Sequence, residues 1–283
     1  MWQRRYVSGS RIVGQCRKFC LEVIPLSNIS VYRLGYFRGT LLFMFKHQGK
    51  ARTLTHNMRI ASLLSFVAGM VNVAGFLAVQ RLTTNVTGHF AFFVDEVFKL
   101  NLWQAFIYFL YVLFFFLGSF VSNFLVELIS KKDERYIYVI PTLIESFILF
   151  LMAVFGTFLI AENPNLLAFS LLFAMGLQNS LVTAISSATV RTTHLTGLFT
   201  DLGIELSQLF FYRQPEQKVK LMASIKLRFT IIGFFSVGGI LSGVLYSRID
   251  LYVLAVASGV LLLGLISDSL KLKLIGMKRK YGY

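Results

Sequence analysis

The stretch TTNVTG, residues 83–88, carries the strongest signal in this chain, because TTHLTG at residues 192–197 repeats it. The pattern G-x-x-N lies upstream of each copy, at residues 69–72 and 176–179. One chance match of six small polar residues would mean little. Two markers in the same order predict an internal duplication.

The composition predicts a membrane protein. Of the 283 residues, 56% are hydrophobic and only 14% are charged, with a mean hydropathy of +0.68. A soluble domain cannot bury that much apolar surface, and the uncharged runs are longer than a core helix needs. We therefore predict an all-α polytopic membrane protein whose first partner is the lipid bilayer.

The net charge of +15 is distributed in clusters between the apolar runs. Residues 1–59 hold eleven Lys and Arg residues against one acid, Glu22. This pattern is typical of cytoplasmic segments that face anionic lipid, so we expect no nucleic-acid partner.

Residues 1–57 form a basic segment without an apolar run of the roughly 20 residues that a span needs. It can be an amphipathic arm on the membrane surface, a poorly ordered cytoplasmic tail, or a stretch ahead of a translation start at Met58. Cys16 and Cys20 form a single C-x-x-x-C pair in a basic segment, which is a weak signal for a metal or redox site. We expect two unpaired, reduced thiols.

The rest of the chain divides into two halves and a basic tail. We place the boundaries at residues 58–162 for the first half, 163–270 for the second and 271–283 for the tail. Six apolar runs are long enough to span a bilayer: residues 60–80, 100–126, 136–161, 166–190, 229–247 and 251–267. Two further elements, residues 82–98 and 192–212, carry the motifs. Turns are expected at residues 162–165 and 248–250, and a polar basic loop at residues 213–228.

The positions of the basic clusters predict the topology. The N-terminal arm, residues 131–135, residues 213–228 and the C-terminal tail should all be cytoplasmic. The chain must then cross an even number of times between successive clusters, so neither motif element crosses fully. This predicts six full transmembrane helices, two short or re-entrant helices, two inverted repeats and both termini in the cytoplasm of a bacterial cell. If both motif elements cross, the result is eight spans in parallel repeats.

Each motif places Thr-x-x-Thr-Gly at the start of an apolar helix. Threonine is a competent N-cap, glycine permits close approach, and a helix that begins inside the membrane presents free N–H groups to a polar or anionic solute. The alternative is that the threonines bond their own backbone and the glycines pack helices. The predicted substrate-binding residues are Asn72, Thr84, Thr87, Gly88, Asn179, Thr193, Thr196 and Gly197.

Acids in or beside apolar segments are the second signal, because a charge at bilayer depth usually faces a cavity or a partner. They are Asp95, Glu96, Glu127, Glu145, Asp201 and Glu205. We assign the coupling or proton-binding role to Asp95, Glu96, Asp201 and Glu205. Lys99 is near enough in sequence to pair with Asp95. Arg213, Arg81 and Arg191 are candidate partners for the carboxylates, and the alternative for Arg81 and Arg191 is that they only anchor helix ends.

His89 and His194 lie in or beside the motifs, where we expect hydrogen-bonded packing rather than metal binding. No metal-ligand spacing, nucleophile elbow, phosphate loop or dinucleotide fingerprint occurs in a suitable context. We therefore expect no metal, no cofactor and no enzymatic activity.

The motif residues also carry a resemblance. Residues 69–76 (GMVNVAGF), Thr87-Gly88-His89, residues 176–180 (GLQNS) and residues 191–197 (RTTHLTG) resemble the YoaK-type family of bacterial integral membrane proteins of unknown function. The resemblance covers about residues 58–269 and implies a multi-spanning membrane protein. Asn85 stands where the second copy has His194, so a site built from both copies should be asymmetric.

We expect a small-solute or ion transporter or channel whose site lies at the paired Thr-x-x-Thr-Gly helix starts. A membrane scaffold or assembly protein without transport is the alternative, and an intramembrane enzyme is the least favoured class. The sequence is also compatible with a homo-oligomer.

Overall fold

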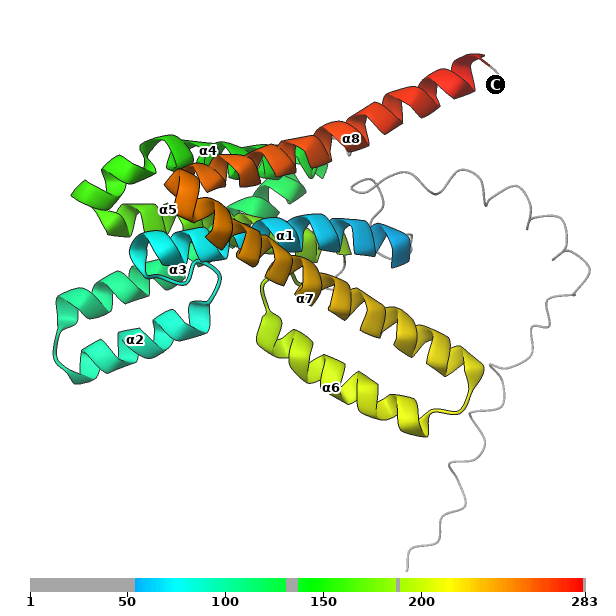
Figure 1. Cartoon of the computed structure of the whole chain (residues 1–283), viewed down its shortest axis with the longest axis horizontal. Coiled ribbons are helices and arrows are strands. Elements are labelled where there is room, and N and C mark those ends of the chain that lie inside the picture. The colour runs from blue at the N-terminus through cyan, green and yellow to red at the C-terminus, as the bar shows by residue number, and fades with distance from the viewer. Residues whose placement is uncertain (1–53, 131–136, 187–188, 282–283) are drawn as a thin grey trace, which may run out of the picture. The chain divides into compact units, whose positions relative to one another are not determined.

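The computed structural model describes residues 54–130, 137–186 and 189–281, with side chains to Ser267, and these residues are helical apart from short connections (Figure 1). The helices are α1 (Leu54–Val79), α2 (Val86–Phe98), α3 (Leu102–Ser130), α4 (Val139–Glu162), α5 (Pro164–Ser186), α6 (Leu195–Phe211), α7 (Pro215–Ile249) and α8 (Val253–Tyr281), with a 3₁₀ turn η3 (Asp250–Tyr252) between the last two. The predictions for residues 1–53, including Cys16 and Cys20, and for the cluster at 131–135 concern residues outside the described part.

Five helical segments are long and apolar enough to cross a bilayer: α1, α3, α4, α5 and a fifth segment that runs from Pro215 to Ser267. The fifth segment contains both of the last two predicted spans, which meet at η3. This bears out the all-helical polytopic class. The motif helices α2 and α6 are shorter, with 13 and 17 residues, as the sequence predicts.

Two boundaries late in the chain differ from the prediction, and α1 begins at Leu54, within the predicted arm. The segment 213–228, expected to be a polar loop, is helical from Pro215 onward. Proline suits the first helical position, and Leu221 and Ile225 then bury a face against Leu202 of α6. The basic residues of this segment are therefore displayed on a helix. α8 likewise continues through most of the predicted tail, to Tyr281.

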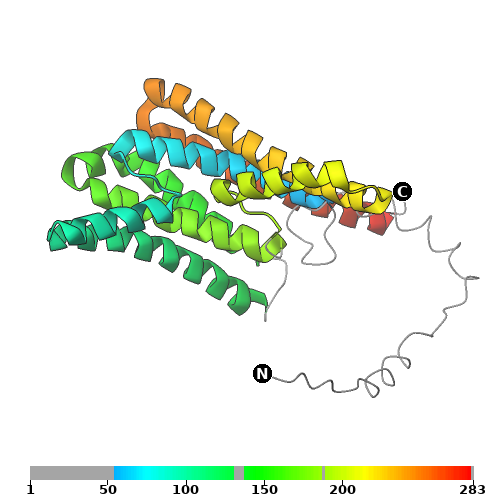
Figure 2. The same ribbon diagram turned by 90° about the horizontal axis from the view of Figure 1, so that it is seen from below.

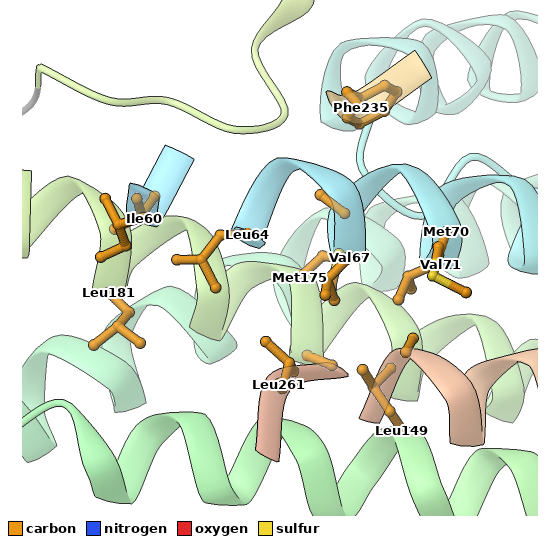
Figure 3. Close-up of a cluster of buried hydrophobic side chains, with 14 of the residues drawn as sticks. Ile60, Leu64, Val67, Met70, Val71, Leu149, Met175, Leu181, Phe235 and Leu261 are labelled. Carbon is orange, nitrogen blue, oxygen red and sulfur yellow. The ribbon is translucent and has the colours of Figure 1, made fainter. Parts of the chain in front are cut away.

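Helices α1 and α5 form the centre of the bundle. In each of them 61% of the apolar window is buried inside the protein, against 28–39% in the other spanning segments. Ile60, Leu64 and Val67 of α1 lie among Met175 and Leu181 of α5 in the core that Figure 3 shows. The other spanning helices keep large apolar side chains exposed, as expected for surfaces that face lipid.

Glycines fix two close helix crossings that correspond to each other. A Cβ on Gly69 of α1 would lie 2.0 Å from the Phe235 carbonyl oxygen of α7, and one on Gly238 of α7 would lie 2.1 Å from the Phe66 oxygen of α1. In the other pair of helices, a Cβ on Gly118 of α3 or on Gly176 of α5 would lie 2.1 Å from a backbone oxygen of the facing helix. Only glycine permits these backbone approaches.

The remaining contacts follow the same correspondence when α1–α4 are matched with α5–α8. Helix α2 packs on α3 as α6 packs on α7, and α4 packs on α5 as α8 packs on α1. Helices α4 and α8 meet each other, and there Ser146 and Ser258 each donate a hydrogen bond to the other's carbonyl oxygen, at 3.1 and 2.8 Å.

The two short helices run in opposite directions. Figures 1 and 2 both show α2 and α6 starting near the middle of the long helices and diverging toward opposite ends of the bundle. Helices α4 and α8 also run in opposite directions in Figure 1. This arrangement positions the two motifs, which lie just before and within the starts of α2 and α6.

Candidate functional site

Matched hydrogen bonds tie the two motifs to the central helices. The Thr84 hydroxyl donates to Oδ1 of Asn72 in α1 at 2.8 Å, and the Thr193 hydroxyl donates to Oδ1 of Asn179 in α5 at the same distance. The asparagines are thus brought together with the threonines predicted to share their site. Each bond holds the chain ahead of a short helix against the middle of a long one.

The neighbouring threonines are fully buried and strengthen this attachment. Thr83 donates to the Val71 carbonyl oxygen at 3.3 Å, and Thr192 lies 3.5 Å from Oδ1 of Asn179. Buried hydroxyls need a partner, and these find one on the central helix. The threonines at the front of both motifs therefore anchor the chain.

The expected threonine N-caps are wrong. Asn85 caps α2, where its Oδ1 accepts a 3.0 Å bond from the Gly88 N–H. His194 occupies the same position before α6 and makes no side-chain cap bond. Thr84 and Thr193, which directly precede these two positions, are engaged by the central asparagines and are therefore not available as caps.

Gly197 makes room for the residue at its helix cap position and Gly88 does not need to, and the nearest neighbours of both glycines belong to those cap residues. A Cβ on Gly197 would lie 2.4 Å from Nδ1 of His194, whereas one on Gly88 would lie at least 3.4 Å from Asn85, an ordinary contact. The close helix approach occurs instead at Gly69 and Gly176, the upstream markers.

The last threonine of each motif has a different environment. Thr87 and Thr196 lie in the first turns of α2 and α6, and both are exposed. Neither hydroxyl makes a hydrogen bond to the described residues. They are the motif hydroxyls with free hydrogen-bonding capacity at the helix starts.

The acids of α2 lie at its far end. Asp95 pairs with Lys99 and raises the pKa of that exposed amine, chiefly through a hydrogen bond. Glu96 accepts a 3.0 Å bond from Asn101. The structure thus confirms the pairing of Asp95 with Lys99 and places both acids away from the helix start.

The acids of α6 share one partner, Arg228 of α7. Its guanidinium donates to both Glu205 carboxylate oxygens, at 2.8 and 3.0 Å, and to Asp201 at 2.9 Å. Ser224 also donates to Glu205. The predicted partners Arg213 and Arg191 make none of these contacts. Sequence reasoning missed Arg228 because it placed this residue in a loop, whereas the helix brings it opposite α6.

Arg81 has an aromatic environment and no acid. Its guanidinium carbon lies 5.4 Å from the ring centroid of Tyr108, and it makes no ion pair within the described residues. His89, which is 2% exposed, lies beside Tyr108 and Tyr111, and its Nε2 donates to the Leu82 carbonyl oxygen at 2.8 Å. His89 is therefore a packed, hydrogen-bonded residue, as predicted.

Glu145 is the most buried acid in the described part of the chain. It lies in α4 next to Ser146, is completely inaccessible, and neither carboxylate oxygen finds a hydrogen-bond partner there. Gln178, beside Asn179 in α5, is buried without partners in the same way. The sequence indicates Glu145 as an acid in a span, while nothing in the sequence singles out Gln178.

Comparison with known proteins agrees with the helical architecture. The chain is 25% identical over 220 residues to the UPF0700 transmembrane protein YoaK of Bacillus subtilis (strain 168), which covers 77% of this chain and 96% of that protein. No solved structure matches the chain. A family model described as "Protein of unknown function (DUF1275)" matches residues 60–267, the region that holds both motifs and almost all of the described helices. The chain therefore belongs to the DUF1275 family, in agreement with the resemblance to YoaK-type membrane proteins.

Proposed function

We propose that this membrane protein is a transporter or channel for a small polar or anionic solute, with its site at the starts of α2 and α6. The observation that carries the proposal is the matched pair of bonds from Thr84 to Asn72 and from Thr193 to Asn179. Both bonds hold a helix start against a buried central helix, and helix starts expose backbone N–H groups.

The proposed topology has six crossings and two helices that do not cross. The segment from Pro215 to Ser267 would extend about 80 Å as one helix, far beyond a hydrocarbon core of about 30 Å, so its two parts should cross separately around η3. Helices α2 and α6 then return to the side from which they entered. With cytoplasmic basic clusters, α2 enters from outside and α6 from inside.

The two halves are proposed to be inverted repeats. The corresponding glycine crossings, the reciprocal serine bonds and the opposite directions of α2 and α6 all support this assignment. In such an arrangement two helix starts can present N–H groups to the same region of the membrane interior. That geometry suits a solute with hydrogen-bond acceptors.

Thr87 and Thr196 are the side chains assigned to bind the solute, because they lie in the first turns and their hydroxyls are not engaged by other described residues. The coupling role of Asp201 and Glu205 stays a prediction. Both carboxylates are bonded to their shared partner Arg228, so coupling would require that this cluster rearranges. Asp95 and Glu96, at the far end of α2, would act near the outer surface.

The test is solute flux in proteoliposomes. Thr87→Val and Thr196→Val remove one hydroxyl each without changing the side-chain shape, and each should lower the flux of the transported solute. Thr230→Val is the matched control, because its hydroxyl bonds within α7, to the Lys226 carbonyl oxygen. Unchanged flux in both motif variants, with normal folding, would contradict the proposed site.

A scaffold or assembly protein is the second candidate. It is favoured by the bonds that use the Thr84 and Thr193 hydroxyls within the bundle, because a purely structural motif would be satisfied in this way. The absence of any flux above that of empty vesicles, over a panel of polar and anionic solutes, would support this candidate.

A further inference from the structure

A polar groove lies between α3 and α5, beside the predicted site. It has a volume of about 350 Å³ and is lined by Ser119, Asn123, Asn179, Ser180, Thr183 and Ala184. Five of these six residues are polar and uncharged. They lie in two helices that are long and apolar enough to cross the membrane.

The groove has unused hydrogen-bonding capacity. Asn123 and Thr183 are exposed, and no hydrogen bond joins their side chains or that of Ser180 to other described residues. Asn179 uses Oδ1 to accept from Thr193, which leaves its amide N–H groups available. Unpaired polar groups are costly in hydrocarbon, so these side chains should contact water or a polar ligand.

The corresponding surface of the other half is less polar, although Asn72 corresponds to Asn179. When Gly69 is matched with Gly176 and Gly118 with Gly238, Thr183 corresponds to Phe76, Ser180 to Val73 and Asn123 to Gly243. Val73 closes that surface, because a Cβ on Gly239 would lie 3.0 Å from its side chain. The polarity at positions 123, 180 and 183 therefore belongs to one half alone, and helix packing, which both halves share, does not explain it.

We propose that this groove is a water-filled binding site for a small uncharged solute with hydrogen-bonding groups, and that it forms the cytoplasmic half of the transport pathway. This inference rests on the proposed function. Asn179 links the groove to the start of α6 through Thr193. Asn123 and Thr183 follow the Gly118–Gly176 crossing on their helices, on the side from which α3 continues to the basic cluster at 131–135.

Thiol labelling tests the groove without requiring transport. Asn123→Cys and Thr183→Cys are made in a background that carries Cys16→Ser and Cys20→Ser, and inside-out vesicles are treated with small charged methanethiosulfonate reagents. Controls are Phe120→Cys, whose parent side chain is 57% exposed on the apolar face of α3, and Phe76→Cys, the counterpart of Thr183→Cys. Because only the hydrated thiolate reacts, both groove cysteines should react at least about tenfold faster than the controls.

The charge of the reagent tests the solute class. No lining residue is ionised, so the cationic and anionic reagents should react within about threefold of each other once their solution rates are divided out. A preference of about tenfold or more for either reagent would overturn the uncharged class. Groove cysteines that react as slowly as Phe120→Cys would overturn the hydrated groove, because lipid would then cover it. A spontaneous disulfide between two Asn123→Cys chains would also overturn it, because a second copy of the chain would then cover it.

The two proposals fail separately. If the groove cysteines react and the flux of Thr87→Val and Thr196→Val is unchanged, the hydrated groove is supported and the proposed solute site at the starts of α2 and α6 is contradicted. If the groove cysteines do not react and the flux of those variants is reduced, the solute site is supported and the hydrated groove is contradicted.

Discussion

The two halves of the bundle make corresponding backbone contacts but differ in their charges. In the second half, Arg228 forms ion pairs with both Asp201 and Glu205 between α6 and α7. In the first half, Tyr108 occupies the position that corresponds to Arg228, and the arginine near it, Arg81, stacks on its ring. The comparison teaches that glycine crossings and threonine–asparagine bonds specify the architecture that both halves share. The charged and aromatic side chains beside α2 and α6 differ between the halves without changing that architecture.

The largest effect should come from the glycine crossings, where the halves are most alike. Gly176→Ala and Gly238→Ala would each place a Cβ about 2.1 Å from a backbone oxygen, so the helices must separate. We expect a loss of about 3 kcal/mol in the free energy of unfolding, or no folded protein at all. Gly233→Ala is the control, because nothing lies within 4 Å of its Cβ position. Thermal unfolding in detergent measures this loss. If one of the two variants keeps normal stability, the two crossings are not equivalent and the prediction is contradicted.

The arginines should distinguish the halves. Arg228→Ala leaves Glu205, whose side chain is 13% exposed, without its cation, and should lower stability by about 2–4 kcal/mol. Arg81→Ala removes an aromatic contact and should cost about 0.5–1 kcal/mol. Chemical denaturation of both variants measures the difference. Equal losses of stability in the two variants would mean that the ion pairs of Arg228 stabilise the protein no more than the aromatic contact of Arg81 does.

Removal of the threonine–asparagine bond should cost about the same stability in each half. Thr84→Val and Thr193→Val each remove the donor that lies 2.8 Å from an asparagine oxygen, and each should cost about 1–2 kcal/mol. Thr230→Val, which loses only a bond to its own helix, should change stability by less than either. Unequal losses at the two motifs would show that only one of them anchors its helix.

The helix caps should give the smallest effects and separate the halves once more. Asn85→Ala removes the cap bond to Gly88 and should cost about 1 kcal/mol. His194→Ala removes no cap bond and should change stability by less than about 0.5 kcal/mol. Unfolding of the two variants under identical conditions tests this. A larger loss for His194→Ala would assign the histidine a structural contact beyond its position before α6.

Much of the architecture could be predicted from the sequence, because apolar runs and their lengths report directly on spanning helices. The motif repeat also singled out Asn72, Thr84, Asn179 and Thr193, although it did not predict which asparagine and threonine would bond. The partner of Glu205 could not be predicted, since Arg228 reaches it only through the packing of α7 on α6. Gly118 and Gly238 were missed as well, although each adjoins a second small residue within an apolar run, which is a usable signal for a close crossing.

The polar groove was beyond the sequence for another reason. Asn123 and Thr183 are 60 residues apart in the chain, and neither belongs to a repeated motif. Only the parallel packing of α3 and α5 brings them to one surface. Periodicity identifies a helix, but it does not tell which polar residues of two helices will meet.

The central claim is that α2 and α6 are half-crossing helices that enter from opposite sides. Labelling of single cysteines with a membrane-impermeant maleimide, in a background without Cys16 and Cys20, tests it most directly. The proposed topology predicts that Lys99→Cys and Asn163→Cys react from outside intact cells, while Gln214→Cys reacts only after the cells are permeabilised. Protection of Lys99→Cys in intact cells would contradict the claim, because α2 would then cross the membrane completely.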